Sequence, residues 1–284
     1  MVTKQVQQSI IFFLFSLASW FSVALLLFIV AFVFSKGVPV ISWTFLTSFW
    51  SHLDITSGGI IQALLGTVYL GIGVIVFSLP IGVLTAIYLQ EYAKDSLFTR
   101  IISLTVRNLA GVPSIVYGMF GLAFFVLLLN FGTSLLAASC TLSIMTIPWI
   151  ITSTQEALKA VPFSFREGSY ALGATKWQTI RRNVLPHATS GILTGSIIGV
   201  SRALGETAPI IMVGATFFMD YLPHSVFDKF MALPYHLFIL ATQHADPLAQ
   251  TYAMGVAVVL ILFIFVLNLG SFYVRYRIRS MKKW

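Results

Sequence analysis

Two charged side chains stand four residues apart in an otherwise apolar stretch, and they are the strongest candidates for chemistry in this sequence. Arg202 and Glu206 lie between the uncharged runs 183–201 and 207–219. A guanidinium is a planar fork of donors that binds an oxyanion through two hydrogen bonds. An Arg at the centre of a membrane helix costs about 2.5–3.5 kcal/mol on insertion, so its presence needs a reason. Three interpretations stay open: an ion pair within one helix, a proton relay, and a binding site for an anion.

Small residues precede this pair at the spacing of one helix face. Gly191, Gly195 and Gly199 are followed by Ala203. Such a ladder allows another helix to approach closely inside a membrane. Because position 202 comes seven residues after 195 and position 206 seven after 199, both charges are predicted to lie on this packed stripe. They would then face protein or a pathway, not lipid.

The elements that position these residues are predicted to be membrane helices. Of the 284 residues, 58% are hydrophobic and 9% are charged, against about 25% charged in soluble domains. A bilayer core needs about 20 apolar residues per helix. The runs without Asp, Glu, Lys or Arg are 5–35, 55–90, 108–155 and 247–274. The third is long enough for two helices joined at Asn130–Thr133, and with the helix around Arg202 the sequence predicts an all-α membrane protein with six transmembrane helices.

The predicted organisation begins with an anchor helix over 1–36. Its apolar run from Ile10 to Phe34 exceeds the roughly 7–15 residues of a signal peptide, which indicates a retained helix. An outer loop over 37–60, a core of five helices over 61–275 and a basic tail over 276–284 follow. A second outer loop, 216–250, is expected to form a folded cap, to re-enter the membrane in part, or to contact a binding protein.

The basic residues predict the orientation. Six crossings put both termini on one side with the loops 91–111 and 154–187, and that side holds 14 of the 17 Lys and Arg. By the positive-inside rule it is the cytoplasmic side. The net charge of +8 is therefore explained by topology and anionic lipid headgroups, without nucleic acid. No metal is expected, because ligand spacing is absent among His52, His187, His224, His236 and His244.

The inner loop 154–187 is too long for a simple connector. We predict a short helix over Phe163–Leu172, a break at Gly173, and a second helix capped by Thr175 and ended by Pro186. One interpretation is a rigid element that docks on a partner protein. The alternative is an amphipathic helix at the membrane surface, anchored by Trp177.

This loop resembles the EAA loop of ABC-importer permeases, whose pattern is E-A-A-x3-G-x9-I-x-L-P. The chain has Gly168 and Ser169 for the two Ala and Asn183 for the Ile. The resemblance implies that the loop docks on a separate cytoplasmic ATPase. The coupling residues it implies are Glu167, Gly168, Ser169, Ala171, Gly173, Leu185 and Pro186. Because no G-x-x-x-x-G-K-[ST] occurs, ATP and Mg²⁺ are expected on that ATPase, and no cofactor is expected in this chain.

A second resemblance covers the charged pair. The segment Ser201–Pro209 is similar to the S-R-A-x-G-E-T-A-P signature of phosphate-importer permeases. Further matches lie at Gly58–Ala93, Gly111–Gly118 and Ala232–Tyr235, so the likeness covers about 50–275. It implies a type I importer permease with a MetI-like core and cytoplasmic termini. It also implies that Arg202, Glu206 and Thr207 lie along the path of phosphate.

The resemblance implies a transport subunit, not an enzyme, in the inner membrane of a bacterium or archaeon. The expected partners are a homologous second permease, a dimer of ATPase subunits and an extracytoplasmic phosphate-binding protein. Sulfate, molybdate or phosphonate stay open as cargo. A free-standing anion channel or proton-coupled carrier, and a membrane hydrolase with Glu206 as its base, are the alternatives from other classes.

Overall fold

A computed structural model describes residues 2–51, 55–244 and 246–280, and every named element in them is helical. The α-helices are α1 (Val2–Gly37), α2 (Trp43–Thr47), α3 (Ile61–Ile87), α4 (Leu97–Leu109), α5 (Ser114–Gly121), α6 (Leu135–Lys159), α7 (Ser164–Ala171), α8 (Lys176–Thr179), α9 (Leu185–Leu204), α10 (Ala208–Val213), α11 (Leu233–Thr242) and α12 (Ala249–Ser280). A 3-10 turn, η1 (Val38–Val40), and three π-helical turns, η2 (Tyr88–Tyr92), η3 (Leu122–Leu128) and η4 (Ile180–Val184), complete the list. The prediction of an all-α fold is confirmed.

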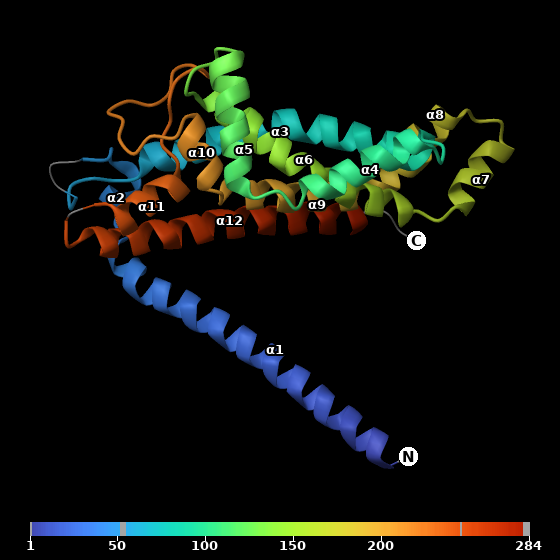
Figure 1. The fold of residues 1–284 in the computed structure, drawn as a ribbon, viewed down its shortest axis with the longest axis horizontal. Helices are drawn as coiled ribbons and strands as arrows, with labels where there is room; N and C mark the ends of the chain where they lie inside the picture. The colour runs from blue at the N-terminus through green and yellow to red at the C-terminus, as the bar shows by residue number, and fades with distance from the viewer. Residues whose placement is uncertain (1, 52–54, 245, 281–284) are drawn as a thin grey trace.

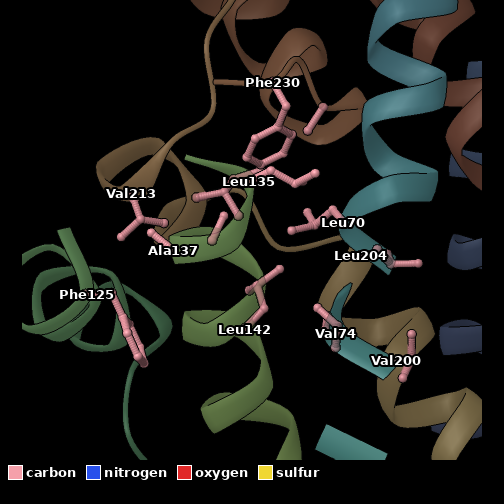
Figure 2. Close-up of a cluster of buried hydrophobic side chains, with 14 of the residues drawn as sticks. Leu70, Val74, Phe125, Leu135, Ala137, Leu142, Val200, Leu204, Val213 and Phe230 are labelled. Carbon is pink, nitrogen blue, oxygen red and sulfur yellow. The ribbon is translucent and has the colours of Figure 1, made fainter. Parts of the chain in front are cut away.

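The body of the molecule is a bundle in which α3, α6, α9 and α12 run along the long axis (Figure 1). Leu70 and Val74 of α3 meet Leu142 of α6 and Val200 of α9 in the central apolar cluster (Figure 2). Buried hydroxyl groups on α3 and α6 donate to the carbonyl four residues earlier, as Thr67 does to Ala63 O. Such bonds satisfy polar side chains where water is absent.

Helix α1 stands apart from this bundle. It leaves the outer end of the body and runs beside empty space for most of its length (Figure 1). Its contact with the body is at its end, where the Gly37 backbone lies against the Met254 backbone of α12. The exposed side chains are large and apolar, with Phe12 and Phe28 at 64% and 68% exposure. In a membrane this helix therefore faces lipid or another subunit.

The count of membrane crossings is less simple than predicted. Within the described residues, four helices are long and apolar enough to cross: Lys4–Val40, Ile61–Tyr92, Leu135–Lys159 and Ala249–Arg277. A bent pair, α4 with Ser114–Leu128, raises the number to five at most. Helix α9 stands where the helix around Arg202 was expected. The number six stays a prediction.

The bend between α4 and α5 adds detail to the predicted inner loop 91–111. Residues 97–109 of that loop form a helix, and Ser114–Leu128, the helix before the turn at 130–133, makes an angle of 105° with it. Pro113 explains the break, because it disfavours helical backbone at Val112 and has no N–H to donate. The Tyr117 hydroxyl donates to Leu109 O at 2.7 Å and holds the corner.

The turn predicted at 130–133 is confirmed, and α6 follows it. Asn130 and Gly132 have φ angles of 57° and 66°, in the left-handed region that Asn and Gly tolerate best. Ser134 then caps α6, accepting from the Ala137 N–H. At the far end of α12 the helix includes residues 276–280 of the predicted tail, whereas 281–284 and His52 lie outside the described residues.

The outer end of the bundle is covered by a folded cap. Gln62 of α3 accepts from Trp50 N–H and donates to Met219 O, each at 2.7 Å. Leu233 N–H donates to the Thr67 hydroxyl at 2.9 Å. The described residues of loop 216–250 thus fold onto α3 and form α11, and membrane re-entry and contact with a binding protein stay open. The opposite end carries α7 and α8, and α12 ends toward it (Figure 1).

Candidate functional site

Arg202 lies in the last turn of α9, on the surface of this chain. Its guanidinium carbon is 4.7 Å from the centre of the Trp149 ring on α6. A cation over an indole face is a favourable arrangement, stronger where water is excluded. The Arg202 side chain is exposed, and Trp149 is 45% exposed. The guanidinium is therefore oriented by α6 while its donors remain accessible.

The ion pair, one of the three interpretations of Arg202 and Glu206, is not present among the described residues, and the expectation that both lie on one helix stripe is wrong. Helix α9 ends at Leu204, so Glu206 is not on the same helix as Arg202. None of the hydrogen bonds or ion pairs between described residues joins these two side chains. Pro209 explains the end of the helix: its ring would clash with the carbonyl four residues earlier, that of Gly205, and it has no N–H to donate. Glu206 and Thr207 are half-buried in the break before α10.

The glycine ladder of α9 faces α6. A Cβ at Gly191 would lie 2.8 Å from Ala157 Cβ, and one at Gly195 would collide with Ser153. At Gly199 the helices are further apart, because a Cβ would lie 3.5 Å from Thr146 and 3.6 Å from the Cβ of Trp149. Arg202 lies at the end of this glycine stripe of α9, where its guanidinium stacks on the Trp149 ring of α6. Trp149 was missed in the sequence, because only packing shows that this residue, the one aromatic of α6, lies beside Arg202.

Two segments singled out in the sequence meet beside this site. Gly118 of α5 lies against Pro209 of α10, and a Cβ at Gly118 would lie 2.9 Å from Pro209 Cα. The segment Gly111–Gly118 therefore supports the break that follows Arg202. Only a glycine permits so close an approach of two backbones.

The inner loop forms the predicted helix, break and second helix, with one correction. Helix α7 covers Ser164–Ala171, Gly173 has a φ of 77°, and Thr175 caps α8 in a capping box with Gln178. Pro186 does not end the second helix. Helix α8 continues through the π-helical turn η4 into α9, with helical backbone angles at Ile180 and Leu185. A wider turn accommodates the missing N–H of a proline.

The predicted coupling residues divide into an outward and an inward set. Exposed are Glu167, Gly168, Ala171 and Gly173. Around them Phe163, Tyr170 and Leu172 expose 65%, 41% and 90% of their surface. The buried Ser169 hydroxyl shares a hydrogen bond of 2.9 Å with that of Thr179, which holds α7 and α8 together as a helical hairpin. Leu185 and Pro186 are half-buried in the first turn of α9.

One buried ion pair beneath α7 was not foreseen. Arg166 Nη2 lies 2.6 Å from Glu91 Oε1, and the side chains are only 10% and 7% exposed. In the sequence Arg166 counted only toward the charge of the cytoplasmic side, Glu91 also lay in the resemblance over Gly58–Ala93, and 75 residues separate the two. Opposite charge alone does not show which of the 9 acidic and 17 basic residues pair with each other. Within the described residues, no three His, Cys, Asp or Glu side chains gather as metal ligands.

A family model supplies the comparison that decides the class. The model described as "Binding-protein-dependent transport system inner membrane component" matches residues 78–280. The chain belongs to this family. It is thus an ABC permease, a multi-pass transport subunit that works with an ATPase and a substrate-binding protein.

Individual relatives agree with this assignment. The permease is 29% identical over 269 residues to the "Probable ABC transporter permease protein YqgI" of Bacillus subtilis, covering 91% of each chain. It is 36% identical over 217 residues to the "Phosphate transport system permease protein PstA" of Mycobacterium leprae, covering 75% of this chain and 69% of that one. Among solved structures, a bacterial alginate ABC transporter matches with a TM-score of 0.63 at 16% identity over 91% of this chain and 95% of that one. The MetNI methionine transporter matches at 0.61 and 20% identity over 78% and 94%. These two support the importer fold.

Proposed function

We propose that this permease is a membrane-spanning subunit of an ATP-driven importer of inorganic phosphate, in which it forms half of the translocation pathway. The observation that carries the proposal is the exposed Arg202 at the end of α9, within the segment Ser201–Pro209. An orienting aromatic ring and free donors suit an oxyanion that passes and is released. Relatives named as phosphate transport permeases, at 36–40% identity, support the choice of cargo.

The exposure of Arg202 supports a shared pathway. A charge on a lipid-facing surface is costly, so this surface is expected to meet another subunit or a water-filled passage. A homologous, PstC-like second permease would supply the other half. Glu206 and Thr207, half-buried in the break after α9, would line the same passage. Glu206 would accept the hydrogen bond of the proton that phosphate carries and sulfate lacks.

The exposed apolar face of α7 supports a docking role at the inner surface. Phe163, Tyr170 and Leu172 expose their apolar side chains around Glu167 on a short helix with a tight glycine turn. Such a compact projection fits a cleft on a partner protein. We expect a PstB-like ATPase dimer there, a PstS-like binding protein at the outer face, and a location in a bacterial or archaeal inner membrane.

The test is uptake by the complex that co-purifies with this chain. Wild-type complex in vesicles should take up radiolabelled phosphate only with ATP, and Arg202→Ala should reduce uptake at least about tenfold, as expected for a lost charged contact of 1.5–3 kcal/mol. Arg100→Ala is the matched control, because its partner Asp95 is exposed and such pairs contribute little. ATP-independent uptake would refute the importer class. Full uptake by Arg202→Ala would refute the role of Arg202.

The cargo is tested by competition. Excess unlabelled phosphate should suppress uptake, whereas sulfate, molybdate and phosphonate should not. Glu206→Gln should lower the preference for phosphate over sulfate. An unchanged preference would place selectivity outside this pair.

A further inference from the structure

The ion pair between Arg166 and Glu91, beneath α7, is buried, unlike the ion pair between Lys159 and Glu156 nearby. Arg166 Nε also donates to Glu91 Oε2 at 3.3 Å, so both carboxylate oxygens are held by one edge of the guanidinium. By contrast, the side chains of Lys159 and Glu156, at the end of α6, are 53% and 66% exposed. Ion pairs that water screens contribute little, whereas removing one partner of a buried pair is strongly destabilising.

The guanidinium of Arg166 joins three parts of the molecule. Beyond Glu91, its Nη1 donates to Val161 O at 2.9 Å and its Nη2 to Leu158 O at 3.1 Å. Glu91 belongs to η2, the π-helical turn that continues α3. Leu158 lies in the last turn of α6. One side chain of α7 thus binds the inner ends of both α3 and α6.

The other contacts of α7 are with its own hairpin and with one apolar cluster at the inner end of the bundle. Arg166 and Ser169 are its buried residues, and Ser169 bonds within the hairpin, to Thr179. Phe165 packs against the apolar cluster that includes Leu158 and Ile180, and it adds an aromatic contact with His187, whose ring centre is 4.8 Å away. A cleft of about 560 Å³ lies beside the ion pair, lined by Gln90, Glu91, Arg166 and Tyr170 among others. Arg166 therefore provides a direct polar link from α7 to the inner ends of α3 and α6.

We propose that Arg166 and Glu91 are positioning residues that transmit the displacement of α7 to α3 and α6. The inference rests on the proposed docking of α7 on an ATPase. A link of this kind must be stiff in a fixed direction, and a bidentate guanidinium held by two further carbonyls provides that, whereas apolar packing allows sliding. Helices α3 and α6 pack along their lengths and also against α9, so a displacement at their inner ends reaches the helix that carries Arg202.

The test compares coupling with assembly in the reconstituted complex. Glu91→Gln should leave the ATPase bound and hydrolysing ATP, while phosphate imported per ATP falls at least about fivefold, within the 5–150-fold range of coupling between sites. Glu91→Asp, which keeps the charge but shortens the side chain, should fall in between. Glu156→Gln is the matched control and should retain the wild-type ratio. A wild-type ratio for Glu91→Gln would overturn the proposal.

A second readout does not depend on the cargo. In the assembled complex, Glu91→Gln should raise hydrogen exchange in 88–92 and 164–171 together, and Glu156→Gln should not. Unchanged exchange in both segments would overturn the link. If the wild-type complex fails to import phosphate, the proposed cargo is wrong, and the exchange data alone judge the link. If Glu91→Gln prevents assembly, Glu91→Asp decides: normal exchange and a normal ratio would overturn the proposal.

Discussion

Replacing Gly195 with Ala should force α6 and α9 apart. The new Cβ would collide with both Cβ and Oγ of Ser153. Rotation of the Ser153 side chain cannot relieve this collision, because its Cβ is fixed to the backbone. The helices must separate until carbon atoms are again about 3.5–4.0 Å apart, which loosens contacts along the whole pair.

The magnitude follows from two opposing effects. Overpacking of a close contact costs about 1–3 kcal/mol. Ala is better than Gly in a helix by about 0.8–1.0 kcal/mol, which offsets part of that cost. At Gly199 only the gain applies, because a Cβ there would lie 3.5–3.9 Å from Thr146, Trp149 and Ile150, an ordinary contact distance. Gly195→Ala should therefore be less stable than Gly199→Ala by about 1–3 kcal/mol.

The assay is thermal unfolding of the purified complex in detergent, followed by loss of soluble protein. For a chain of this size, each kcal/mol shifts the unfolding midpoint by about 2–4 °C. Gly195→Ala should unfold several degrees below Gly199→Ala, with Gly191→Ala between them. Equal midpoints for the Gly195 and Gly199 variants would refute the close approach of these helices.

The remaining predictions concern the hairpin and the cap. Gly173→Ala should destabilise the hairpin by about 1–2 kcal/mol through its φ of 77° alone, since nothing lies within 4 Å of the new Cβ. Gly168→Ala is the control, because its Cβ would be equally unobstructed and it lies within α7. Equal hydrogen exchange of the α7–α8 hairpin in the two variants would contradict the predicted backbone strain at Gly173. Gln62→Ala should remove the two hydrogen bonds that its amide makes with Trp50 N–H and Met219 O, at about 1–3 kcal/mol each, and lower the unfolding midpoint. An unchanged midpoint would mean that water replaces the amide.

The inner hairpin shows how far local signals reach. Gly173 and Thr175 each act within a few residues of their own position, and the turn and the helix cap that they predicted both occur. Pro186 was misjudged because its local preference for ending a helix was overcome by the π-helical turn before it. Whether a proline ends a helix depends on whether neighbouring groups or a local π-helical turn can satisfy the backbone carbonyl that loses its N–H partner.

The sequence by itself determined that this chain is an all-helical membrane protein with a basic inner side and a projecting hairpin, because apolar length, charge scarcity and turn chemistry are local properties. Only the tertiary structure decided which distant side chains meet. Arg166 finds Glu91, and Arg202 finds Trp149 instead of Glu206, through the packing of α3, α6, α7 and α9. The reason is physical: a charge in an apolar medium must be paired or oriented, and the fold, not sequence spacing, sets which group lies within reach.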